Sequence, residues 1–410
     1  MRMLIVMILG SVVVCPGSIH ADAPMIETYL QTGQSAKGEA ALIAHLKQKP
    51  ADSQAQFGLG FLQFIQAIEH LGQGLYRYGP RTDHSATFAI PILRLPVPTN
   101  PKPEQATYEA LQRMLLDFQA DLARAESSLA RVKDSAVKLP IHLLRIRLDF
   151  DNNGVAETEL RGIVERYVRG GSPLPKDLDL RVDFDRGDVD WLRGYCHLLT
   201  GISEVMLAHD GQELMDTIGF LLFYNVKTPH EFLKHLKPEQ HWWGLGNVDV
   251  IDLIAFAHQV LKLPLKEPAR MKSALEHFEK VFALSKTSWA FIQAETDSEN
   301  EWLPNPNQTG PLGVRLTKEQ IKTWLEFVDE MNDLLAGKRL IPFWRGDFEK
   351  RGVNLRKVFL EPRTFDVILW VQGTGAAPYL EKGEMTRPGI WNNIQRVFGG
   401  DFFGFALWFN

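Results

Sequence analysis

The sequence predicts a mainly α-helical protein: a multi-helix globular body that begins with a helical hairpin and ends in a C-terminal cap containing short strands. Before Gly337, apolar residues recur at the spacing of a helix face, and Pro, Gly, Asn and Asp residues separate the periodic stretches. After Gly337, segments dense in branched and aromatic side chains favour strands. The chain has 410 residues, 45% hydrophobic and 23% charged, as is ordinary for a soluble globular protein. Its net charge of −5 is spread out, which gives no electrostatic reason to expect a nucleic-acid partner.

The N-terminus has the layout of a secretory signal peptide. Arg2 precedes an apolar run from Leu4 to Val14, which is followed by a Pro-Gly break and the sequence Ala21-Asp22-Ala23. An apolar run of this length is too short to span a bilayer. We therefore expect an exported protein, periplasmic or secreted, with no transmembrane segment in the mature chain. Cleavage leaves Cys196 as the only cysteine, which excludes an internal disulfide.

Two amphipathic helices are predicted over residues 36–48 and 53–79. Their apolar positions recur at helical spacing, and Pro50, Ala51 and Asp52 separate them. Two helices joined across such a turn resemble a tetratricopeptide unit. Because one unit is visible and a stable solenoid needs about three, we expect a hairpin packed on the rest of the protein.

The middle of the chain reads as a series of helices joined by loops. A proline-rich segment, 80–103, precedes them. Thr317 and Gln320 form a capping box at the start of the clearest helix, and Gly337 ends it. The predicted helices cover 104–134, 155–169, 187–208, 210–222, 248–261, 267–285 and 317–336.

The C-terminal segments "FDVILWVQ" and "FFGFALWF" are predicted to be short buried strands or tightly packed terminal segments. No low-complexity linker separates domains. The expected division is a signal peptide, a tetratricopeptide-like hairpin, a helical body and a cap packed on it, at residues 1–23, 24–79, 80–336 and 337–410 respectively.

The stretch "LDFDNNGVAETEL" resembles an EF-hand-type calcium loop. Carboxylate and amide oxygens recur at alternate positions and Gly154 permits a sharp turn, as in positions one to six of such a loop. The twelfth position is Leu160, which cannot ligate, so the closing glutamate falls one residue early. The predicted Ca²⁺ ligands are Asp149, Asp151, Asn153 and Glu159.

A second interpretation of this loop needs no ion. Asp and Asn side chains commonly bond to their own backbone and cap the next helix. The same choice applies to the acidic stretch "VDFDRGDVDW", which either contributes to an ion site or supplies Asp185 or Asp188 as a helix N-cap.

Four stretches, "LYRYG", "RLPVPTNP", "FDRGDVDWLRGYCHLL" and "RVFGGDFFGFALWFN", resemble an uncharacterised family of exported bacterial proteins of unknown function. The resemblance covers nearly the whole mature chain. It implies export and a single unit, and it implies no catalytic residues.

Taken together, these patterns predict an exported soluble protein with a structural calcium site, acting as a binding or scaffold protein. Its partner is unknown, and another exported protein is the candidate. The alternative is a periplasmic hydrolase or metal-dependent enzyme with a site assembled from distant residues. The candidates for that site are Glu69, His70, Asp183, Asp185, Asp188, His230, His235, His241 and His258. His230 and His235 are five residues apart, which does not match the four-residue spacing of a zinc-protease helix.

Overall fold

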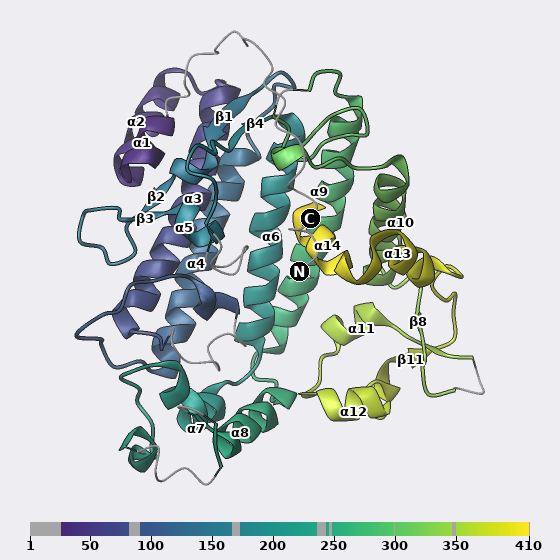
Figure 1. The fold of residues 1–410 in the computed structure, drawn as a ribbon. Helices are drawn as coiled ribbons and strands as arrows, with labels where there is room; N and C mark the ends of the chain where they lie inside the picture. Colours follow the sequence, from purple (N-terminus) through teal and green to yellow (C-terminus); the bar gives the residue numbers. More distant parts are fainter. Residues whose placement is uncertain are drawn as a thin grey trace.

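The fold is described by a computed structural model (Figure 1) that covers residues 26–81, 91–165, 173–235, 243–245, 248–298, 300–346 and 350–409. The predicted signal peptide and His241 lie outside these residues. The structure is 61% helical, with fourteen α-helices in the described ranges, which confirms the mainly α-helical fold. None of the described helices is both long enough and apolar enough to cross a bilayer.

Four long helices form the centre of the molecule: α3 (Ser53–Tyr78), α4 (Tyr108–Leu129), α6 (Arg186–Ala208) and α9 (Pro268–Ala294). They pack in that order, each on the next (Figure 1). The hairpin helix α2 (Ser35–Gln48) packs on α3, and α1 (Glu27–Thr32) packs on α2. On the other side of the molecule, α10 (Lys318–Leu335) packs on α9 and α13 (Ile390–Phe398) packs on α10.

Shorter helices complete the described chain. α7 (Gln212–Leu222) and α8 (Val250–Leu261) pack on each other below the central helices in Figure 1. The others are α5 (Leu160–Ile163), α11 (Leu355–Leu360), α12 (Val367–Gln372) and α14 (Phe402–Phe409). Of the helix predicted over 155–169, residues 158–159 instead pair as a strand, α5 follows them, and residues 166–169 lie outside the described part of the chain.

The strands are short and antiparallel. Four two-stranded ladders join β1 (Leu139–His142) to β4 (Arg181–Phe184), β2 (Arg147–Leu148) to β3 (Thr158–Glu159), β5 (Gly244–Leu245) to β6 (Val248–Asp249), and β7 (Lys262–Leu263) to β10 (Phe365–Asp366). A three-stranded sheet in the C-terminal part has the order β11-β9-β8, from β11 (Leu380–Glu381), β9 (Gly352–Val353) and β8 (Ile341–Pro342). The C-terminal cap thus contains short strands, as predicted.

Side-chain caps begin the helices that the sequence located best. Asp52 accepts a hydrogen bond from the backbone N of Ala55 (2.9 Å) at the start of α3. Thr317 and Gln320 form the predicted capping box at α10, and Gly337, with a φ of 71°, follows the end of that helix. These bonds satisfy first-turn N–H groups that have no partner inside the helix.

The strand interpretation of the two C-terminal segments is wrong. In "FDVILWVQ" two residues form β10 and the rest form α12, with Ile368 and Val371 exposed. "FFGFALWF" is the helix α14. Phe402, Phe405 and Phe409 pack into one cluster, and their spacing of three and four residues is that of one helix face. The many aromatic residues of this segment favoured a strand interpretation, although their spacing is also that of a helix face.

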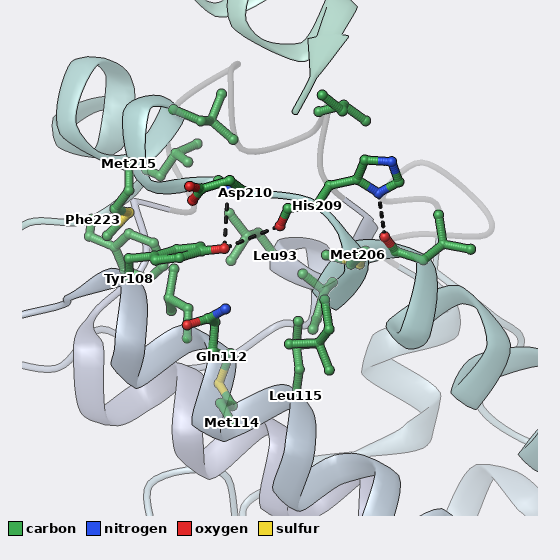
Figure 2. A pocket seen from close by; sticks show the side chains of 18 residues that line it. Leu93, Tyr108, Gln112, Met114, Leu115, Met206, His209, Asp210, Met215 and Phe223 are labelled. Carbon is green, nitrogen blue, oxygen red and sulfur yellow. Dashed lines mark hydrogen bonds between the residues drawn. The ribbon is translucent and has the colours of Figure 1, made fainter. Parts of the chain in front are cut away.

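Two large apolar clusters form most of the core, and a third, small one joins Val353, Ala376 and Tyr379 in the C-terminal part. The larger joins buried residues of α2, α3, α4, α6 and α7, and the smaller joins those of α9, α10, α13 and α14. Trp191 and Trp302 pack against both clusters. The packing leaves an apolar cavity of about 270 Å³ between α4, α7 and the end of α6 (Figure 2).

We predict that Gly72→Ala destabilises the protein by about 1–2 kcal/mol, since overpacking costs about 1–3 kcal/mol and the helix propensity of Ala returns a part. A Cβ at Gly72 in α3 would lie 2.2 Å from the Phe150 ring, which is itself fully buried. Urea unfolding measures the change. The control is Gly162→Ala in α5, where no atom lies within 4 Å of the added carbon. An equal loss in both variants would contradict this account of Gly72.

Candidate metal centre

The N-terminus of α6 brings two aspartates together. β4 ends at Phe184, and Asp185 then accepts a hydrogen bond from the backbone N of Gly187 (2.8 Å). The Asp188 carboxylate reaches back and accepts from the backbone N of Asp185 (3.0 Å). The two side chains form a reciprocal capping box, which confirms the interpretation of Asp185 as a helix N-cap.

The segment after α9 brings two glutamates to the same place. Glu295 directly follows α9, and the Asn305 amide donates hydrogen bonds to the backbone oxygens of Ile292 (3.1 Å) and Glu295 (3.2 Å). Gln308 donates to the Glu295 carboxylate (3.3 Å). These amide bonds fold the segment back over the end of α9, and Glu301 lies within this folded segment.

Asp185, Glu295 and Glu301 form a cluster in which one carboxylate oxygen of each lies within 4.8 Å of the others. It is the one group of three acidic, histidine or cysteine side chains at this spacing in the described part of the chain. Glu301 and the adjoining Asp188 are each only 3% exposed. Gly187 borders the cluster, since a Cβ there would lie 2.8 Å from Ile292 Cγ1, 3.3 Å from Asp185 Oδ1 and 3.4 Å from Glu295 Oε1.

Burial opposes the ionisation of this cluster. Burial, and then the charge of Asp185, raises the pKa of Glu295 to about 10. Burial, followed by the charges of Asp185 and Glu301, raises the pKa of Asp188 well above its ordinary value. Burial also raises the pKa of Asp185. Neighbouring buried carboxylates cannot all stay charged unless a cation joins them, so the cluster holds either protons or a metal ion.

One oxygen of Asp188 distinguishes this cluster from an ordinary helix cap. Its Oδ2 accepts the capping hydrogen bond, whereas Oδ1 is buried and has no hydrogen-bond partner. An unsatisfied buried oxygen costs about 1–3 kcal/mol, and such groups in folded proteins often face an ion or a water. The three clustered carboxylates and the unpartnered Oδ1 of Asp188 match the hard oxygen ligands that Ca²⁺, Mg²⁺ and Mn²⁺ prefer.

In the loop predicted to bind calcium, the side-chain oxygens form hydrogen bonds and an ion pair within the loop and its flanking strands. Asp149 accepts hydrogen bonds from the backbone N of Asn153 (3.2 Å) and of Gly154 (2.9 Å). The Asn153 amide donates to Asp151 (2.8 Å). Glu159 lies in β3, and its carboxylate pairs with the Arg147 guanidinium of β2 at 2.5 Å. The calcium site at Asp149, Asp151, Asn153 and Glu159 therefore stays a prediction.

The other proposed catalytic residues have separate partners. Glu69 is buried and accepts hydrogen bonds from Ser35 Oγ and from the backbone N of Asp149, both at 2.8 Å. Burial raises the pKa of Glu69. His70 bonds to Asp121 (2.7 Å). Glu69 thus supports the acidic loop, whereas His70 pairs with α4.

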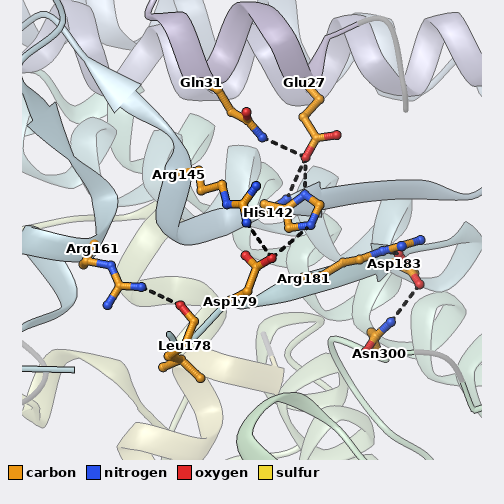
Figure 3. A network of polar contacts seen from close by, with 10 residues as sticks. All are labelled: Glu27, Gln31, His142, Arg145, Arg161, Leu178, Asp179, Arg181, Asp183 and Asn300. Atoms are coloured by element: carbon orange, nitrogen blue, oxygen red, sulfur yellow. Dashed lines mark hydrogen bonds and ion pairs between the residues drawn. The ribbon is translucent and has the colours of Figure 1, made fainter. Parts of the chain in front are cut away.

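Asp183, two residues before Asp185, belongs to the polar network of Figure 3. It accepts hydrogen bonds from Arg181 (2.8 Å) and from the Asn300 amide (3.0 Å). Asn300 adopts a φ of 56°, and it immediately precedes Glu301. The network therefore anchors the segment that carries Glu301. His230 and His235 lie at the short helix Glu231–His235, and His258 lies in α8.

The sequence identified Asp185 and Asp188 but missed Glu295 and Glu301. The signal was present, because "ETDSENE" places acidic residues at alternate positions from 295 to 301. This is the same pattern that drew attention to the loop at 149–153.

The fold and the cluster define a mainly α-helical protein with a partly buried carboxylate cluster. A comparison of the chain with known protein families, characterised proteins and solved structures gives no match. The function therefore has to be argued from the site itself.

Proposed function

We propose that the protein binds one divalent cation at Asp185, Asp188, Glu295 and Glu301, and that this ion is structural within an exported helical binding protein. The observation that carries the proposal is the buried, unpartnered Oδ1 of Asp188 beside a three-carboxylate cluster. Calcium is the expected ion, because all the ligands are oxygens and exported proteins use calcium sites with Kd values of about 10⁻⁴–10⁻³ M.

The ion would join segments that are distant in the sequence. Asp185 and Asp188 belong to the start of α6, Glu295 follows the end of α9, and Glu301 belongs to the next loop. An ion that binds only the folded chain stabilises it by about 2.7 kcal/mol at one hundred times its Kd. The ion would thus cross-link a mature chain that has no internal disulfide.

The burial of Asp188 and Glu301, beside the half-buried Asp185 and Glu295, favours a structural ion over a catalytic one. A catalytic metal keeps a coordination position open to substrate. Glu301 and Asp188 are each 3% exposed, so a macromolecular substrate would not reach them without local opening.

In the chelator-treated protein, we expect 5 mM CaCl₂ to raise the melting temperature by about 1–3 °C. Two variants locate the ion. Glu295→Gln should abolish the rise, because it removes a carboxylate from the cluster, whereas Asp151→Asn should retain it. Differential scanning calorimetry measures all three proteins, and MgCl₂ and MnCl₂ titrations define the preferred ion.

The opposite pattern, a rise that is lost in Asp151→Asn and retained in Glu295→Gln, would move the ion to the loop at 149–159. No rise in the unmodified protein with any of the three ions would overturn the proposal. The cluster would then hold protons, and Glu295→Gln should leave the stability unchanged or raise it.

A further inference from the structure

The apolar cavity at the C-terminal end of α6 is a second feature with the properties of a ligand site. It has a volume of about 270 Å³ and lies between α4, the end of α6, α7 and the short helix Pro91–Arg94 (Figure 2). The side chains that enclose it are mostly aliphatic or aromatic, with three methionines, Met114, Met206 and Met215, among them. Methionine adapts its shape to flexible apolar ligands.

The size of the cavity limits the ligand. A dry apolar cavity of about 150 Å³ binds benzene, which has six carbons. By proportion, a cavity of 270 Å³ accommodates roughly ten carbon atoms. A sterol or a two-chain lipid is too large, whereas one unbranched chain of this length fits.

The polar groups at the cavity indicate which head group the ligand carries. The Tyr108 hydroxyl is already used, since it donates to the backbone O of His209 (3.2 Å) and accepts from the backbone N of Gly211 (3.0 Å). His209 Nδ1 bonds to the backbone O of Val205 (2.7 Å). The Gln112 amide lines the cavity and has no hydrogen-bond partner in the described part of the chain.

A free amide both donates and accepts, which suits a neutral hydroxyl. Asp210 also lines the cavity, and its carboxylate pairs with Lys266 Nζ at 4.0 Å, so the described lining residues include no cation that would hold an anionic head group. We propose that this cavity binds a neutral single-chain amphiphile, an alkyl chain of about ten carbons that ends in a hydroxyl group held by Gln112.

The test uses 1-decanol to displace the fluorescent probe 1-aminonaphthalene, whose ten carbons match the cavity volume, from the full-length mature protein. Decanol should displace the probe, and decanoate at pH 8 should be at least fivefold weaker. Met206→Trp should weaken decanol binding at least tenfold, because it fills the cavity. Ile202→Trp is the matched control: both residues are 44% exposed on α6, but Ile202 does not line the cavity.

Gln112→Leu gives a readout that does not depend on the cavity volume. It should lower decanol affinity while leaving probe affinity unchanged, and circular dichroism checks that each variant is folded. Absence of displacement from the unmodified protein would overturn the proposal, and equal binding of decanol and decanoate would overturn the neutral head group. All measurements are made with calcium and with chelator, so the result is independent of the ion proposal.

Discussion

Replacing Phe409 with alanine is expected to lower the free energy of unfolding by about 3–5 kcal/mol, the usual cost of removing a buried phenylalanine. Phe409 is 0% exposed. Its ring centroid lies 5.1 Å from that of Trp289 and 5.5 Å from that of Trp324, which belong to α9 and α10. Because α14 is the last helix, this side chain holds the chain end in the smaller apolar cluster.

Phe403→Ala is the control for Phe409→Ala. Both residues belong to α14, but Phe403 is 80% exposed. Its replacement should change the stability by no more than about 0.5 kcal/mol. Urea unfolding followed by tryptophan fluorescence measures both variants, since Trp289 and Trp324 report on the cluster. Similar losses in the two variants would contradict the placement of α14.

Acidification from about pH 6.5 to 4 is expected to lower the stability by about 2 kcal/mol through His277. In the contact between α6 and α9, His197 Nδ1 and His277 Nδ1 are 2.9 Å apart. Burial, and then the charges of His197 and Lys280, lowers the pKa of His277 to about 4. The unfolded chain therefore takes up this proton near pH 6.5, before the folded protein does. Each pKa unit is worth about 1.4 kcal/mol, which solvent screening reduces for this half-buried group.

Glu126, which pairs with His197, causes a second loss of stability at a lower pH. Its hydrogen bond with His197, and then that with Arg193, lowers the pKa of Glu126 to about 2 against the opposing effect of burial. Its contribution is complete above about pH 4.5 and is lost as the pH falls toward 2. Thermal unfolding between pH 3 and 8 separates the two losses. His277→Gln should flatten the curve between pH 4 and 6.5, and an unchanged slope in that variant would contradict this role of His277.

Local signals predicted most of the helices. Helix periodicity and a capping box gave 317–336 where the structure has Lys318–Leu335. By contrast, α9 runs to Ala294, nine residues beyond its predicted end at 285. Ser285 and Ser288 are poor helix formers in isolation, but both are fully buried, and Ser285 accepts a hydrogen bond from Trp324 of α10 (3.2 Å). Tertiary packing here outweighs intrinsic propensity.

The candidate site was harder to predict than the fold. The loop at 149–159 attracted attention because all of its oxygens are adjacent in the sequence. The carboxylate cluster instead depends on the packing of α6 against α9, which sequence spacing does not encode. Asp185 and Asp188 were recognisable as helix-start residues, whereas the partnership with Glu295 and Glu301 required the fold.

The length of α6 determines how its two ends can communicate. The helix has 23 residues, so the carboxylate cluster at its first turn and the apolar cavity at its last lie roughly 35 Å apart. Electrostatic influence decays over about 8 Å in physiological salt, so a charge that binds at one end of the helix has no through-space effect at the other. Any cooperativity between the two sites would require a rigid-body displacement of α6.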